Sequence, residues 1–242
     1  MNILIVNDDG IYSPGISALA EVAREFGRVT LVAPDGERSS TGHAVTHSRP
    51  LSYRKTVIGD HEAFRVDGTP ADCVAVAFSI AQRFDLVLSG INMGYNLGNS
   101  MWHSGTLAGA KQAALMGSRG IALSAPASTT EPEFEALRPW VKQVLTLLLP
   151  DVDLPLVNVN FPLRPQHLMW ARQSVRHYDG KVVPIKDPMG RQLYWFTVVP
   201  LETADEGTDR WAVERQCVSI TPLRLDLTDM PALERAAARK PT

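Results

Sequence analysis

The sequence is poor in cysteine and has no long apolar run. Its two cysteines, Cys73 and Cys217, are far apart and belong to no C-x-x-C pair, so no disulfide framework is expected. No segment approaches the roughly 20 apolar residues of a membrane-spanning helix, and the first residues lack the basic and apolar stretches of a signal peptide. We therefore expect a cytoplasmic protein that needs no membrane partner.

An excess of charge of one sign is also missing. The 24 Lys and Arg residues nearly balance 26 Asp and Glu residues, for a net charge of −2. A protein that grips nucleic acid through its phosphates is usually more basic, so no nucleic-acid polymer is required as a partner. The 242 residues, 45% of them hydrophobic, can form a core without disulfides.

The first two thirds of the chain alternate between short β-prone runs and helix-spaced apolar patterns. Residues 3–6 form a continuous apolar run, 15–26 show helical spacing, and 29–33 form the next β-prone run. Strand, helix and strand at this spacing make a βαβ unit, which favours a parallel sheet. Because the alternation continues to a strand at 157–161, we predict an α/β core over residues 1–165.

The pattern changes after about residue 165. Strands are expected at 169–178, 192–200 and 211–220, joined by turn-rich loops, with a short helix at 231–238. We predict that residues 166–242 form a β-rich extension with a C-terminal helix. Its aromatic residues favour packing either onto the same chain or onto a second subunit.

Polar residues gather where the predicted strands end. Asp8 and Asp9 follow the first strand, and a hard divalent cation would offset the repulsion between their carboxylates. A solvated acidic pair is the alternative. After the second strand, Arg38 suits a phosphate and Ser39 suits a metal or a phosphate, although such a loop is often merely flexible.

Two further clusters follow later strands. Asn92 and Asn96 lie in a glycine-rich segment whose glycine spacing does not match the dinucleotide fingerprint G-x-G-x-x-G. His103, Ser104 and Thr106 precede or open a helix, where backbone N–H groups and hydroxyls can bind an anion or simply cap the helix. Ligands of open α/β sheets bind at the carboxyl ends of strands, so the four clusters predict one site.

Several motifs together resemble one family. The chain is similar in order, over nearly its whole length, to the SurE family of metal-dependent 5′/3′-nucleotidases. The resemblance is carried by residues 3–10 with 13–15, 32–35, 38–39, 67–74, 89–92, 104–106, 158–160 and 218–223. Two positions depart from the family pattern: Gln216 and Cys217 stand where members often have Gly-Tyr, far from the proposed ligands.

The resemblance implies a Rossmann-like three-layer α/β/α sandwich with a mostly parallel sheet. It also implies homodimers or homotetramers with exchanged C-terminal segments. By position, the family's ligands for one divalent metal ion per subunit, Mg²⁺ or Mn²⁺, match Asp8, Asp9, Ser39 and Asn92. The loop that faces the substrate phosphate matches Asn96, Ser104, Gly105 and Thr106.

The expected function is therefore that of a 5′-nucleotidase, a phosphomonoesterase that releases phosphate from nucleoside 5′- and 3′-monophosphates. Short polyphosphate is a further substrate implied by the resemblance. Asp8 or Asp9 would orient or deprotonate the attacking water, and His103 would protonate the leaving oxygen. The base and the preference between 5′ and 3′ esters stay open.

Three other functions share parts of this pattern. A receiver domain also has an acidic pair after its first strand, but it needs a lysine after the fifth strand, and none is suitable here. A phosphatase with an aspartyl-phosphate intermediate usually needs Asp-x-Asp, whereas Asp8 and Asp9 are adjacent. A nucleotide-binding module without activity would have little need of the paired carboxylates.

Overall fold

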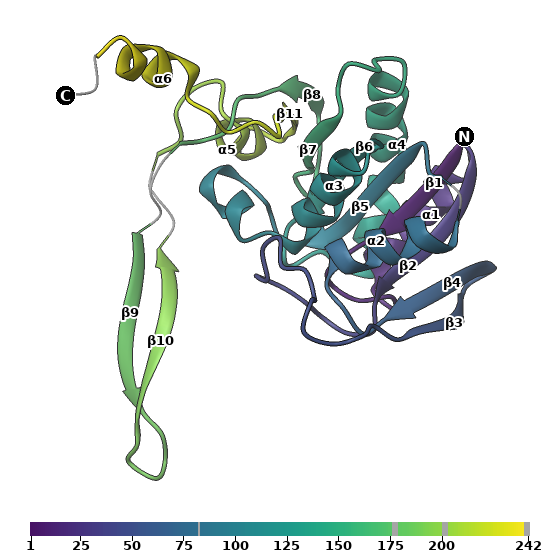
Figure 1. Cartoon of the computed structure of the whole chain (residues 1–242), viewed down its shortest axis with the longest axis horizontal. Helices are drawn as coiled ribbons and strands as arrows, with labels where there is room; N and C mark the ends of the chain where they lie inside the picture. The colour runs from purple at the N-terminus through teal and green to yellow at the C-terminus, as the bar shows by residue number, and fades with distance from the viewer. Residues whose placement is uncertain (82, 176–178, 200–202, 240–242) are drawn as a thin grey trace.

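The computed structural model describes residues 1–81, 83–175, 179–199 and 203–239. Its centre is a nine-stranded sheet in the order β3-β4-β2-β1-β5-β6-β7-β11-β8, covered by helices on both faces (Figure 1). The strands of this sheet are β1 (Asn2–Val6), β2 (Arg28–Pro34), β3 (Tyr53–Ile58), β4 (His61–Val66), β5 (Leu86–Met93), β6 (Arg119–Ala125), β7 (Leu156–Asn160), β8 (His167–Trp170) and β11 (Cys217–Pro222).

The central strands of the sheet are parallel. β4, β2, β1, β5, β6 and β7 run in one direction, whereas β3 is antiparallel to β4, and β11 is antiparallel to β7. All four apolar residues that follow Asn2 in β1 are fully buried, because helices cover both faces of this strand. The predicted α/β fold with a mostly parallel sheet is confirmed.

Alternate residues of β1 show how the three layers pack. Ile3 and Ile5 belong to the core under α1 (Pro14–Ala23) and α4 (Glu131–Leu148). Leu4 and Val6 instead belong to the core under α2 (Pro70–Ile80), and α3 (Gly105–Leu115) covers the same face. The period-2 alternation of a strand therefore supplies both cores, and β1 directs its carboxyl end toward the start of α3.

Two of the predicted strands differ in the structure. Residues 211–220 do not form one strand: α5 (Asp209–Glu214) ends before β11 begins at Cys217. The hydroxyl of Thr208 caps α5, and this capping starts a short helix in a segment whose apolar residues also suit a strand. The predicted strand at 169–178 covers only β8 at its start, and residues 176–178 lie outside the described residues.

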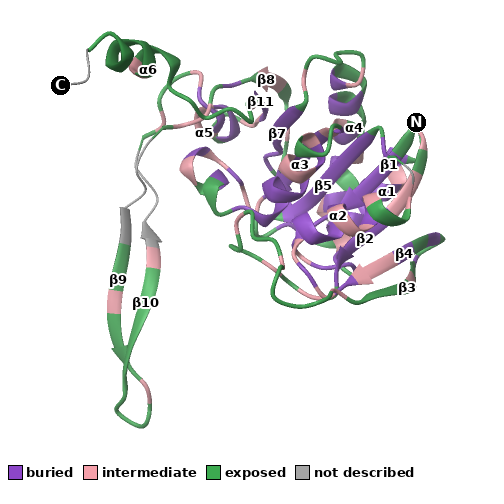
Figure 2. Cartoon of the chain, viewed as in Figure 1, coloured by how far each residue is buried: buried purple, intermediate pink, exposed green. Residues whose placement is uncertain are grey.

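The rest of the C-terminal third extends away from the main sheet. β9 (Asp179–Lys186), which the sequence did not predict, pairs antiparallel with β10 (Gln192–Val199) in a two-stranded hairpin. The hairpin and α6 (Met230–Ala237) project from the body, and most of their described residues are exposed (Figures 1 and 2). The boundary at residue 165 stays a prediction, and β8 and β11 join the main sheet.

Among the helices in the part of the chain that the structure describes, none has the length and apolar character needed to cross a membrane.

Candidate functional site

The paired carboxylates lie at the carboxyl end of β1. Asp8 is only 4% exposed, and its Oδ1 accepts a hydrogen bond of 2.6 Å from the Thr106 hydroxyl. Burial raises the pKa of Asp8 to about 6, with a smaller contribution from the charge of Asp9, and the Thr106 bond only partly opposes it. Burial also raises the pKa of Asp9, whose Oδ2 accepts from the backbone N–H of Met93 at 3.0 Å. A bound cation would relieve the cost of ionising both carboxylates.

The beginning of α3 closes against Asp8. A Cβ atom at Gly105 would lie 2.9 Å from both the Cβ and the Oδ2 of Asp8, so only glycine fits here. The Ser104 hydroxyl caps the helix by accepting from the N–H of Leu107 at 2.9 Å. The Thr106 hydroxyl is fully buried and bonded to Asp8.

The end of β5 and the segment that follows it bring two asparagines to the same place. The amide nitrogen of Asn92 donates to the carbonyl of Gly94 at 2.7 Å, which fixes the side chain. The amide nitrogen of Asn96 donates to the hydroxyls of Ser124 at 2.8 Å and Thr106 at 3.2 Å. Thr106 can therefore donate to Asp8 while it accepts from Asn96, and Asn96 orients the Asp8 carboxylate through this hydroxyl.

Two buried asparagines on β7 hold the backbone of Asn96. Its N–H donates to the Oδ1 of Asn160 at 2.8 Å, and its carbonyl accepts from the amide nitrogens of Asn158 at 2.7 Å and Asn160 at 3.2 Å. The sequence motif at 158–160 did not predict that these two asparagines support the backbone of Asn96. The sequence signal that could have revealed this role is an asparagine side chain at every second position of an otherwise apolar, buried strand.

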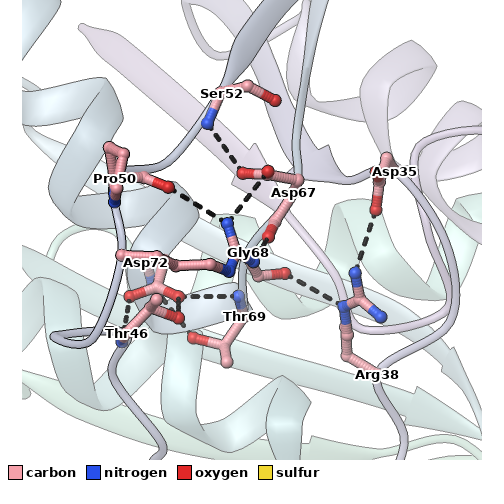
Figure 3. Close-up of polar contacts among 10 residues, drawn as sticks. Asp35, Arg38, Thr46, Pro50, Ser52, Asp67, Gly68, Thr69 and Asp72 are labelled. Atoms are coloured by element: carbon pink, nitrogen blue, oxygen red, sulfur yellow. Dashed lines mark hydrogen bonds and ion pairs between the residues drawn. The ribbon is translucent and has the colours of Figure 1, made fainter.

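The loop between β2 and β3 places Ser39 beside the carboxylates. The N–H of Arg38 donates to the carbonyl of Asp8 at 2.7 Å. The Arg38 guanidinium bonds Asp35 at 3.0 Å and the carbonyl of Gly68 at 3.3 Å (Figure 3). The side chain is thus engaged with the protein rather than aimed at a phosphate, and its backbone orients Ser39.

The same loop is anchored by the motif at the start of α2. Asp72 completes a capping box with Thr69, and it also accepts from the N–H and hydroxyl of Thr46 at 2.9 and 2.6 Å (Figure 3). Farther along the loop, Arg49 pairs with Asp67 at 2.9 Å. Residues 67–72 therefore fix the loop that carries Ser39, a role that the sequence analysis did not assign.

These elements surround one cavity of about 780 Å³. Asp9, Gly105 and Thr106 contact residues of its lining, so the structure brings all nine predicted site residues together. The extension completes the opposite part of the wall. The lining includes the predicted residues Asp8, Ser39, Asn92, Asn96, His103 and Ser104, and, from the extension, Ser174, Val175, Phe196, Thr203, Ala204, Asp205 and Arg210.

The donor set fits a hard divalent cation. Within the described part of the chain, no group of three or more His, Cys, Asp and Glu side chains converges on one point. A metal ion here would depend on two carboxylates with a serine and an asparagine oxygen, an all-oxygen set that suits Mg²⁺ or Mn²⁺ better than Zn²⁺. Because residue 105 is a glycine, the start of α3 approaches the Asp8 carboxylate more closely than any larger residue would allow.

The fold and site define a Rossmann-like α/β protein with an acidic, oxygen-lined site at the carboxyl edge of its sheet. The family model described as "Survival protein SurE" matches residues 3–180. The chain is 44% identical to "5′-nucleotidase SurE 1" of Thermus thermophilus over 97% of its length and 96% of the relative. It is 42% identical to "5′-nucleotidase SurE" of Geobacter sulfurreducens, over 96% of this chain and 91% of the relative.

A solved structure agrees with this similarity. The SurE protein from Aquifex aeolicus superposes with a TM-score of 0.82 at 37% sequence identity, covering 98% of this chain and all of that one. This chain belongs to the SurE family.

The buried charge of Asp8 predicts how the metal-free protein responds to Asp8→Asn. Because the pKa of Asp8 is about 6 in the folded protein and 3.8 in the unfolded chain, ionisation removes stability from the wild type as the pH rises from 4 to 6. In EDTA, Asp8→Asn should therefore raise the free energy of unfolding at pH 7.5 by on the order of 1–3 kcal/mol. Urea unfolding at pH 4 should show little difference, and equal effects at both pH values would contradict this account.

The loop anchor gives a second prediction. Asp72→Ala should accelerate amide hydrogen exchange in residues 38–46, because Thr46 loses both of its bonds to the carboxylate. Glu133→Ala is the matched control, since it breaks the equivalent capping box of α4. Each change should cost about 0.5–2 kcal/mol of stability, but only Asp72→Ala should affect the loop. Faster loop exchange in both variants would argue against the anchor.

Proposed function

We propose that this chain is a 5′-nucleotidase, a divalent-metal-dependent phosphomonoesterase that hydrolyses nucleoside 5′- and 3′-monophosphates to nucleoside and phosphate. The observation that carries the proposal is the carboxylate pair at the carboxyl end of β1: Asp8 is buried in the wall of a cavity of about 780 Å³, and Asp9 lies half-buried beside it. This volume lies in the usual range of small-ligand sites, about 300–1,000 Å³. The names of the relatives support the same reaction.

Asp8, Asp9, Ser39 and Asn92 would hold one Mg²⁺ or Mn²⁺ ion per subunit. When bound, such an ion neutralises charge on a phosphate and lowers the pKa of bound water. The protein's part is to keep these oxygen atoms converged. Thr106 fixes the Asp8 carboxylate, Met93 fixes Asp9, and the Arg38 backbone ties the Ser39 loop to the end of β1.

The phosphate would lie against the start of α3. Ser104 and the backbone N–H groups of Gly105 and Thr106 would bind its oxygens, since the first N–H groups of a helix lack partners within the helix. Asn96 would shape this wall through its bonds to Thr106 and Ser124.

In the reaction, water attacks phosphorus in line with the ester oxygen. Asp8 or Asp9 takes the proton of the water as the new P–O bond forms. The bond to the nucleoside oxygen breaks, and His103, which lines the cavity, donates a proton to that leaving oxygen. The products are nucleoside and phosphate.

We propose short polyphosphate as a further substrate. We also propose a cytoplasmic homodimer or homotetramer with exchanged C-terminal segments. Both cysteines are free thiols, and the described part of the hairpin exposes large apolar side chains, including Tyr194 and Trp195, that a second subunit would cover.

Phosphate release tests the reaction directly. We expect release from nucleoside monophosphates in Mg²⁺ or Mn²⁺ but not in EDTA. Asp9→Asn should lower kcat/KM by several orders of magnitude because the metal site loses a charged ligand. Ser39→Ala should lose less, because water can replace one neutral ligand.

Three results would contradict the proposal. Asp9→Asn with near wild-type turnover at modest Mg²⁺ would overturn the site assignment. Metal-dependent nucleotide binding without phosphate release would favour the binding module. A stable phosphorylated Asp8 or Asp9 would favour the aspartyl-phosphate mechanism.

A further inference from the structure

The active-site wall between β5 and α3 is held from two directions. This wall, residues 94–104, includes the 3-10 helix η1 (Gly98–Trp102) and lines the cavity along much of its length. Asn96 is held from the core by Asn158 and Asn160 of β7. Two residues farther on, Gly98 is held by the C-terminal extension.

Both peptide groups of Gly98 bond to the extension. Its N–H donates to the Oδ2 of Asp209 at 2.8 Å, and its carbonyl accepts from the Nε2 of Gln173 at 3.0 Å. Gly98 has a φ of +52°, and a Cβ atom there would lie 2.8 Å from the carbonyl oxygen of Ser174. The wall and the extension therefore approach so closely that only glycine fits between them.

Asp209 is a fully buried carboxylate that joins three segments of the chain. Its Oδ1 accepts from the N–H of Ser174 at 3.1 Å, from the Ser174 hydroxyl, and from the N–H of Arg210 at 2.8 Å. Its Oδ2 accepts from Gly98, which is 111 residues away in sequence. A buried carboxylate is costly unless hydrogen bonds surround it, and bonds to its charge are stronger than neutral ones.

We propose that Asp209 is a positioning residue of the active site, whose carboxylate fixes Gly98 and thereby sets the wall against which the phosphate monoester binds. The inference rests on the proposed phosphatase function. It makes the base of the extension part of the catalytic unit: Ser174 and Arg210, which bond Asp209, also line the cavity. Asp209 acts through the groups that it bonds, and its bond to Gly98 is the one that reaches the wall.

Asp209→Asn separates this role from general support of the fold. Three donors meet at Oδ1, so the amide oxygen of an asparagine must take that side. The amide nitrogen of the asparagine then faces the N–H of Gly98. Both groups are hydrogen-bond donors, so no bond forms between them. The substitution keeps the contacts within the extension and breaks only the bond to the wall. Gln173→Ala removes the other bond to Gly98 and should act in the same direction, less strongly.

Three measurements on the full-length, metal-loaded protein test the inference. Asp209→Asn should raise KM for a nucleoside 5′-monophosphate and the inhibition constant of inorganic phosphate about tenfold, as expected for the loss of one hydrogen bond to a charged group. The metal concentration for half-maximal activity should change less than about twofold. Amide exchange in residues 97–104 should accelerate, also without substrate.

Val144→Ala is the control for a general loss of stability. Val144 is a fully buried residue of α4, in the core on the opposite face of the sheet from α3. This variant should leave KM, phosphate inhibition and exchange of the wall unchanged. Unchanged values in Asp209→Asn, or equal changes in Val144→Ala, would overturn the inference.

Different experimental results would overturn the inference and the proposed function. If the wild type releases no phosphate, the proposed function fails. Calorimetric binding of inorganic phosphate then decides the inference together with amide exchange: weaker binding and faster exchange in Asp209→Asn support it, and unchanged values overturn it. If the wild type is active and Asp209→Asn matches it in all three measurements, only the positioning role fails.

Discussion

The structure around the cavity depends on one buried carboxylate. Asp8 follows the carboxyl end of the buried strand β1, where its ionised form is unfavourable, and Asp9 beside it adds repulsion. The protein partly offsets this with the Thr106 hydroxyl, which Gly105 allows to approach because a Cβ atom at position 105 would clash with Asp8. A site that is costly without a cation and made only of oxygen ligands has the chemistry of a hard-metal centre. The same buried carboxylate thus destabilises the metal-free protein and is the ligand on which the proposed activity depends.

Different parts of the chain position the groups around that carboxylate. The start of α3 supplies Thr106, the end of β5 supplies Asn92, and the segment after β5 supplies Asn96. Asp72 fixes the loop after β2 through Thr46 (Figure 3). This loop supplies Ser39. The extension contributes through Asp209, which bonds Gly98 at 2.8 Å. The extension therefore does more than present a hairpin to solvent: its base belongs to the same hydrogen-bonded unit as the cavity wall.

Sequence reasoning reached the parts of this site that depend on the order of strands. Asp8 and Asn92 were predicted together because parallel strands deliver their ends to one edge. Residues that act by supporting others were not found. Asn160 bonds backbone atoms 64 residues away, and Asp209 lies in a six-residue helix whose apolar residues also suited a strand. Such roles depend on three-dimensional proximity, for which the local sequence has no signal. The sequence did not predict the edge strand β3, because most of its residues are exposed and it has no apolar face.

The most direct test of the account is a crystal structure with Mn²⁺, in which anomalous scattering locates the ion. The account predicts one strong peak per subunit, bonded to carboxylate oxygens of Asp8 and Asp9 and close to Ser39 and Asn92. Crystals of Asp9→Asn at the same Mn²⁺ concentration should show a much weaker peak. Full occupancy at another place in the fold, or no peak at the paired carboxylates at saturating Mn²⁺, would contradict it.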